Sequence, residues 1–380
     1  MGQSIRLFTF RGIAVRMHLT FPLILVWAAL QFGVFAGGGW GGASFGILVT
    51  LILFSIVILH EFGHSLAAQY YGIEVKQIVI LPIGGVAQIA EIPEDPKQEF
   101  VIAIAGPAVN FVLAGLFSVV LFLTGAGSLL ADLPGLLANF SKMGLGALVG
   151  YLFAANLLLG LFNLLPAFPM DGGRILRSFL ATRMSYPAAT STAAGIGQAL
   201  ALLMGLWAFL QGDFFLVLVA IFIFSGANQE RQLVITRSAL ADLKVRDAYS
   251  RDAVAISPQD PLQRAIELTL AGFQSDFPVC DGTRVVGLLT HSRLVEALTG
   301  HGVDRLVGEV MERDFVTIDP DLDLVDAQRV FAETRTDALP VIRSGQFLGL
   351  LTNRDLMEIY RLATLTQRSS QALSRAQASR

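Results

Sequence analysis

The chain has 380 residues, of which 54% are hydrophobic and 15% are charged, and its mean hydropathy is +0.62. This composition excludes an ordinary soluble enzyme, and a net charge of −3 argues against a nucleic-acid partner. The single cysteine, Cys280, excludes an internal disulfide framework and a thiolate metal cluster.

The charged residues are distributed unevenly along the chain. Residues 1–229 hold 18 of the Asp, Glu, Lys and Arg side chains, and the last 151 residues hold 39. This shift predicts a membrane domain followed by a soluble part. We expect the following division: a membrane domain at 1–229, a linker at 230–243, two soluble modules at 244–300 and 301–362, and a polar tail at 363–380.

The membrane domain contains six apolar stretches that we interpret as membrane helices, after a short hairpin at residues 4–18. They are Leu19–Ala36, Ser44–Tyr71, Phe100–Leu130, Gly144–Leu165, Tyr186–Gly212 and Phe214–Gln229. The sixth is short for the ~20 residues that one crossing needs. The expected fold class is therefore a multi-pass α-helical membrane domain with about six transmembrane helices, followed by an α+β pair.

Positive residues set the expected orientation in the cell membrane. With the N-terminus inside, the outer loops carry only Lys142. The inner segments then carry ten positive residues, namely Arg6, Arg11, Arg16, Lys76, Lys97, Arg174, Arg177, Arg183, Arg231 and Arg237. Since positive residues prefer the cytoplasmic side, we expect the N-terminus and the soluble modules to be cytoplasmic.

Residues 74–92 are too short and too rich in β-branched residues for a membrane span. They predict two strands around a turn at Pro82–Gly85, a short membrane-associated hairpin. A strand edge there could pair with an extended peptide, and the plainer alternative is an interfacial loop.

The second apolar stretch carries the sequence His60-Glu61-Phe62-Gly63-His64. Between Met17 and Ile73 there is no Asp, Lys or Arg, and Glu61 is the only Glu. A carboxylate at membrane depth is costly and therefore rarely without function. Helical spacing puts His60 and His64 on one face, where both could bind one metal ion, with Glu61 beside them to take a proton from a metal-bound water.

A catalytic zinc needs three protein ligands, so one more residue is required. Asp171 is the best candidate, because it follows a membrane span and precedes Gly172-Gly173; it could instead cap the next helix. Asn110 and Asn163 also lie within or beside spans. Either could donate to a developing oxyanion, or hydrogen-bond between helices.

The membrane half resembles the site-2 protease family of intramembrane zinc metalloproteases. The resemblance rests on the His-Glu motif, on Gly106-Pro107-Ala-Val-Asn110, and on Asn163…Pro166…Pro169-Met170-Asp171-Gly172, where the family usually has Leu in place of Met170. It implies one zinc held by His60, His64 and Asp171, with Glu61 as general base. It further implies cleavage of a single-span or membrane-tethered protein, such as an anti-sigma or pro-sigma factor.

The soluble part contains an internal repeat with an offset of 62 residues, so that Pro278-Val279 recurs as Pro340-Val341. The two copies resemble a pair of CBS modules, a resemblance that implies AMP, ADP or ATP as ligand. The resemblance implies that a Thr-x-x-Asp element contacts the nucleotide. Only the second copy has this element, as Thr352-Asn353-Arg354-Asp355, so that Thr352, Arg354 and Asp355 are the candidate nucleotide-binding residues. The first copy has Arg293 in place of the acid. A purely structural pair, or one that forms a homodimer, is the alternative.

A rival interpretation comes from another functional class. A metal-ion transporter or channel regulated by a CBS pair would also place histidines and broken helices in the membrane. It does not explain why Glu61 lies within the histidine pair. Transport would not require that carboxylate, whereas proteolysis would.

Overall fold

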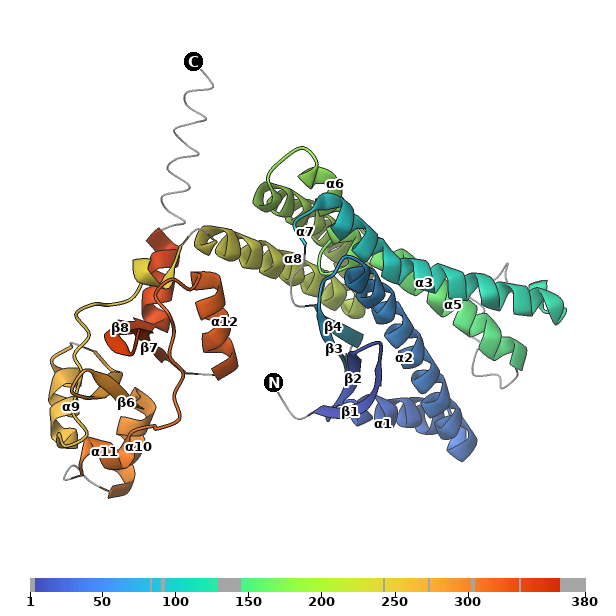
Figure 1. The fold of residues 1–380 in the computed structure, drawn as a ribbon. Helices are drawn as coiled ribbons and strands as arrows, with labels where there is room; N and C mark the ends of the chain where they lie inside the picture. The colour runs from blue at the N-terminus through green and yellow to red at the C-terminus, as the bar shows by residue number, and fades with distance from the viewer. Residues whose placement is uncertain are drawn as a thin grey trace, which may run out of the picture. The chain divides into compact units, whose positions relative to one another are not determined.

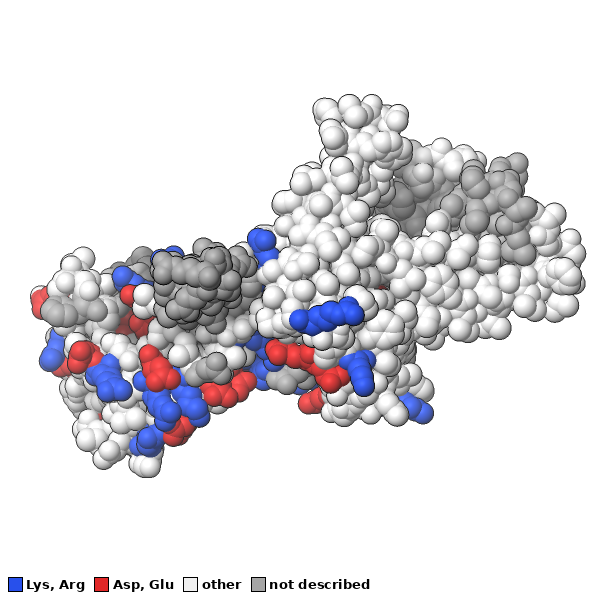
Figure 2. All heavy atoms as spheres, turned by 90° about the horizontal axis from the view of Figure 1, so that it is seen from above, with Lys and Arg blue, Asp and Glu red and all other residues white. Residues whose placement is uncertain are grey.

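The computed structural model describes residues 4–82, 84–89, 93–128, 145–241, 243–272, 274–301, 305–334 and 336–362. The expected outer-loop Lys142 and the polar tail at 363–380 lie outside these residues. The chain divides into two compact units, Met1–Gln232 and Leu233–Arg380 (Figure 1). In Figure 2 charged side chains crowd the second unit, whereas the first unit presents a broad uncharged surface.

A four-stranded sheet in the first unit joins the start of the chain to the segment after the second helix. Its strands are β1 (Ser4–Phe10), β2 (Ile13–His18), β3 (Val75–Leu81) and β4 (Gly84–Ile89), in that order across the sheet. The strands at 4–18 and at 74–92 thus form two antiparallel hairpins, and β2 pairs with β3 in parallel. The apolar face of the sheet packs against the helix Gly39–Tyr70. One cluster of buried residues joins them, and it includes Ile13, Val15, Ile78 and Ile80 of the sheet and Phe62 of the helix.

Apart from a short helix at residues 171–181, the helices of the first unit largely coincide with the predicted apolar stretches. They are α1 (Pro22–Leu30), η1 (Gln31–Phe35), α2 (Gly39–Tyr70), α3 (Pro96–Leu123), α5 (Leu145–Asn163), α6 (Asp171–Ala181), α7 (Tyr186–Gln211) and α8 (Phe214–Leu240). Among the described residues, α2, α3, α7 and α8 are long and apolar enough to cross a membrane, and Pro22–Phe35 and Leu148–Asn163 are shorter. The protein is therefore a membrane protein with at least these four candidate spans, and the count of six stays a prediction.

The sixth predicted span is longer than the hydropathy of the sequence indicates. The hydropathy pattern predicts an end at Gln229, but α8 is 27 residues long in total and ends at Leu240. The polar residues after Gln229 end the apolar stretch without ending the helix. A hydropathy profile therefore underestimates the length of this helix.

Helices α2 and α3 approach each other closely through glycine. A Cβ added to Gly63 would lie 2.7 Å from the carbonyl oxygen of Ala105, so only hydrogen fits there. Gly106, Asn110 and Ala114, which follow one another at intervals of four residues on α3, are all buried. Close packing of this kind brings the backbone of α3 against the His-Glu motif.

The second unit contains two similar modules built from the repeat. The first has α9 (Leu262–Leu270), β5 (Phe277–Asp281), β6 (Arg284–Leu289), α10 (His291–His301) and α11 (Val307–Val310). The second has α12 (Leu324–Thr334), β7 (Ala338–Arg343), β8 (Gln346–Thr352) and helical residues 353–362. Ile256 forms an isolated parallel β-bridge with Val279, and Ile318 forms the same bridge with Val341. The two copies of the repeat therefore share even this single contact.

Each module has its own buried core. The core of the second module includes Leu240 from the end of α8, together with Val245 of the 3-10 helix η3 (Val245–Asp247) and Leu339 of β7. Leu262, Phe277 and Leu289 belong to the core of the first module. Because α8 begins in the first unit and ends in the core of the second, the sequence linker expected at 230–243 is largely helical.

Candidate metal centre

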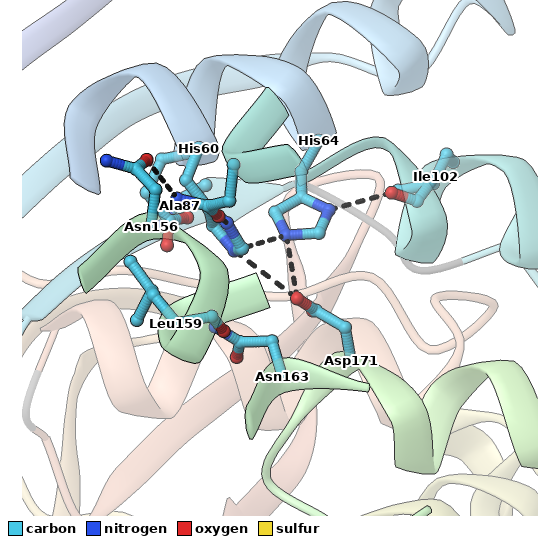
Figure 3. A network of polar contacts seen from close by, with 10 residues as sticks. His60, His64, Ala87, Ile102, Asn156, Leu159, Asn163 and Asp171 are labelled. Atoms are coloured by element: carbon cyan, nitrogen blue, oxygen red, sulfur yellow. Dashed lines mark hydrogen bonds and ion pairs between the residues drawn. The ribbon is translucent and has the colours of Figure 1, made fainter. Parts of the chain in front are cut away.

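Three potential ligand atoms converge between α2 and the start of α6. The Nε2 atoms of His60 and His64 lie 3.1 Å apart, and Asp171 Oδ2 lies 3.3 Å from the first and 3.2 Å from the second. All three residues are buried, and together they form a group that could hold a metal ion. Figure 3 shows both imidazoles pointing toward the carboxylate.

The spacing of these atoms fits a tetrahedral zinc ion. Bonds of about 2.0–2.1 Å in tetrahedral geometry place two ligand atoms about 3.3 Å apart. The three sides of the observed triangle, at 3.1–3.3 Å, are close to that value.

The hydrogen bonds of the two imidazoles orient their Nε2 atoms for metal binding. His64 Nδ1 donates to the carbonyl oxygen of Ile102 at 2.7 Å, and His60 Nδ1 donates to Asn110 Oδ1. Since these oxygens can only accept, each Nδ1 carries the hydrogen and each Nε2 of a neutral ring presents a lone pair. Asp171 Oδ2 has no hydrogen-bond donor among the described residues. Three electron-rich atoms thus face one point, an arrangement that a cation would stabilise.

Asp171 is the first residue of α6, and its side chain does not cap the helix. The N-cap residue is Met170, and no side-chain capping bond is present. The Asp171 carboxylate is directed at the two histidines, so the structure does not show the capping alternative.

Gly106 of α3 leaves the space in which the imidazoles lie. A Cβ at this position would be 2.2 Å from His64 Nε2 and 2.7 Å from His60 Nε2. The motif Gly106-Pro107-Ala-Val-Asn110 contains this glycine but does not indicate that it lies against the metal-binding atoms. Only the fold brings α3 to this point.

Glu61 lies next to the histidines and contacts strand β4. Its Oε2 accepts a hydrogen bond of 3.1 Å from the backbone N–H of Ala87. A Cβ on Gly85 would lie 2.8 Å from Glu61 Cγ, so glycine is required for this close approach. The strand edge expected near the site is therefore beside the proposed base.

The two asparagines expected near the reaction have different environments. Asn110 is completely buried and links α3 to its neighbours, accepting from His60 and donating to Asn156 Oδ1 of α5 at 3.2 Å. Asn110 therefore makes the interhelical hydrogen bonds that were the alternative to an oxyanion role, and it orients a histidine. Asn163 donates to Leu159 of its own helix at 2.9 Å, which engages one of its two amide hydrogens (Figure 3).

Asn156 and Ile102 were missed by the sequence analysis. Asn156 lies within an apolar helix, so its isolation among apolar residues was a usable signal. The role of Ile102 rests on its backbone carbonyl, for which a sequence carries no signal.

The predicted nucleotide residues line a cleft of about 750 Å³ in the second unit. Thr352, Arg354 and Asp355 line it together with residues of the first module, including Asp276 and His291. Asp355 Oδ2 accepts from the backbone N–H and the hydroxyl of Thr352, at 2.9 and 2.7 Å. Arg293 of the first module, which replaces the acid, pairs instead with Glu296 and Glu312.

Profiles of known families match segments in both halves of the chain. The profile of Peptidase family M50 matches residues 48–204, and the CBS domain profile matches 245–300 and 307–361. A zinc metalloprotease of Methanocaldococcus jannaschii is 31% identical over 97% of this chain and 99% of its own length. A putative zinc metalloprotease of Mycobacterium tuberculosis is 28% identical over 96% of this chain and 95% of its own.

Among solved structures, the site-2 protease from Methanocaldococcus jannaschii is 38% identical, covers 60% of this chain and 95% of that chain, and has a TM-score of 0.42. The full-length similarity to the archaeal zinc metalloprotease and the two family matches agree with the motifs in the sequence. The chain belongs to peptidase family M50, the site-2 protease family of zinc metalloproteases, and carries a C-terminal pair of CBS domains.

Proposed function

We propose that His60, His64 and Asp171 bind one zinc ion and that Glu61 is the general base of an intramembrane endopeptidase. The observation that carries this proposal is the triangle of ligand atoms, with sides of 3.1–3.3 Å. A bound zinc supplies a more acidic attacking water and polarises the carbonyl of the scissile bond. Glu61 would accept the proton of that water and pass it to the leaving amine.

The contact with β4 supports this role for Glu61. The N–H of Ala87 holds one carboxylate oxygen, which fixes the side chain in one orientation. The hydrogen bond leaves the other oxygen for a proton of the attacking water. Asn163 has an amide hydrogen left and is our remaining candidate for stabilising the oxyanion.

We further propose that the substrate binds as an extended strand along β4. β4 is the last strand of the sheet and pairs only with β3 within the described residues. The N–H of Ala87 points away from β3 toward Glu61, so the free edge of β4 runs past the proposed base. Alternate residues of a strand share a direction, which adds Gly85 to this edge. An unwound membrane segment needs such partners for its backbone N–H and C=O groups.

This geometry and the family support one class of substrate. The proposed substrate is a membrane-tethered protein cut within or near its transmembrane segment, such as an anti-sigma or pro-sigma regulator. The excess of positive residues on one side supports a cytoplasmic location for both ends of this chain.

Co-expression with single-span regulators tests the proposal. Wild type should cleave such a substrate, and Glu61→Gln should abolish cleavage while keeping one zinc per chain, because only the base is lost. Glu74→Gln, the same change at an exposed position just after α2, is the matched control and should cleave normally. Cleavage by Glu61→Gln would refute the assigned role, and metal transport without cleavage would favour the transporter alternative.

For the CBS pair we propose one adenine-nucleotide site in the cleft lined by Asp355. A carboxylate can accept both ribose hydroxyls, and Arg354 could hold a phosphate. Calorimetry of the purified full chain with AMP, ADP and ATP should show binding that Asp355→Ala weakens and that Glu333→Ala, on the exposed face of α12, does not. Absence of heat with all three nucleotides would leave the pair as a structural or dimer-forming module.

A further inference from the structure

A buried arginine lies at the junction of three helices in the first unit. Arg177 of α6 is completely buried, yet it carries a charge that the apolar surroundings would strongly disfavour without partners. Its Nε donates to Glu99 Oε1 of α3 at 2.8 Å, and its Nη1 donates to Glu230 Oε1 of α8 at 2.7 Å. A second donor, Nη2, also contacts Glu99 Oε1. We call Arg177, Glu99 and Glu230 the arginine clamp.

The clamp connects to the metal ligand Asp171 through α6 and the loop before it. Asp171 starts α6, and Arg177 follows six residues later in the same short helix. The guanidinium group also lies over the ring of Phe168, with 5.0 Å between its Cζ and the ring centroid. Phe168 belongs to the loop that leads directly into Asp171. Arg177 thus contacts the loop before Asp171 through Phe168 and belongs to the helix that follows Asp171.

The loop and helix around Asp171 have little freedom to shift independently. A Cβ on Gly172 would lie 2.1 Å from the carbonyl oxygen of Leu165, and one on Gly173 would lie 2.6 Å from the backbone nitrogen of Phe168. The backbone of the loop therefore touches the backbone of α6. A displacement of Arg177 would be transmitted through these contacts as a displacement of Asp171.

Glu99 connects the arginine clamp to the histidines through α3. Glu99 and Ile102 are one turn apart on α3, and the Ile102 carbonyl accepts the Nδ1 hydrogen of His64. The same helix carries Gly106, which lies against both Nε2 atoms. The contact between Arg177 and Glu99 therefore joins the segment that holds the carboxylate ligand to the segment that orients the imidazole ligands.

We propose that Arg177 is a positioning residue for the metal site, which holds Asp171 at ligand distance from the histidines by tying α6 to α3 and α8. This inference rests on the proposed zinc site. Arginine suits the role because its planar fork donates several hydrogen bonds in fixed directions, which lysine cannot reproduce. Residues that orient metal ligands typically change metal affinity by about 10–100-fold when substituted.

The test measures metal binding by the purified full chain, independently of cleavage. Arg177→Lys keeps the charge but loses the fork, and it should weaken zinc binding at least about 10-fold and alter the visible spectrum of the Co²⁺-substituted site. Glu230→Gln removes the charge of the partner on α8, which is partly exposed, and should have the same effect to a smaller degree. Arg183→Gln removes an exposed cation just after α6 and should leave both readouts unchanged.

A double variant separates positioning from a merely structural role. Glu99→Leu combined with Arg177→Met replaces the main buried ion pair by apolar side chains, a change that can leave stability nearly unchanged. If Arg177 positions Asp171, this folded variant still binds zinc weakly and shows the altered Co²⁺ spectrum. Wild-type affinity and an unaltered spectrum in the folded Arg177→Lys or in the double variant would overturn the inference. Normal zinc binding by a wild type that cleaves no substrate would refute the proposed protease function instead.

Discussion

The substitution Gly106→Ala tests the metal site with a single methyl group. The added Cβ would lie 2.2 Å from His64 Nε2, whereas ordinary contacts begin at 3.4 Å, so the imidazole would have to move by about 1.2 Å. Metal–ligand distances are correct only within about 0.2 Å. We therefore expect zinc affinity to fall by at least about 100-fold, beyond the usual effect of losing an orienting residue.

Zinc content after dialysis against a chelator, together with a competition titration, measures this effect. Gly115→Ala is the matched control, since it makes the same change on the same helix where nothing lies within 4 Å of the new Cβ. The control should bind zinc and cleave substrate as wild type does. If Gly106→Ala retained one zinc with normal affinity, the placement of α3 against the histidines would be refuted.

Three further substitutions address separate parts of the site. Asn110→Leu should lower zinc affinity about 10–100-fold by releasing His60, which a competition titration would show; unaltered affinity would mean that the hydrogen bond does not orient the ring. Asp171→Ala should reduce zinc content as well as cleavage, and a full zinc content would show that the third ligand lies elsewhere. Gly85→Val should keep zinc but lower cleavage at least tenfold by pushing Glu61 aside, and normal turnover would contradict the contact between β4 and the base.

The sequence was sufficient to locate the residues of the candidate metal centre. His60, Glu61 and His64 stand out because a helix repeat places them together in a stretch that otherwise lacks charge, and Asp171 follows from the need for a third ligand. The two hairpins were also predictable, because alternating and β-branched residues flank clear turns. These signals are local, so they can be read without knowing the fold.

The supporting residues could not be predicted because their roles depend on distant contacts. Arg177 looked like one of several positive residues on the inner side, but the fold buries it between Glu99 and Glu230, which are 78 and 53 residues away. For Asn110 the sequence left two roles open, an oxyanion donor or a hydrogen bond between helices, and the structure shows it bonded to His60 and Asn156 of neighbouring helices. The end of α8 was misplaced because hydropathy reports the membrane and not the helix.

The parallel pairing of β2 with β3 has a consequence for biosynthesis. These neighbouring strands are separated in the chain by α1, η1 and α2, so the N-terminal hairpin cannot complete its sheet until these helices have left the ribosome. A lone two-stranded hairpin is marginally stable at best. Closure of the sheet therefore comes after synthesis of α2, when β3 has emerged to pair with β2. The N-terminal hairpin thus waits for its partner strand while the first helices of the protein are being made.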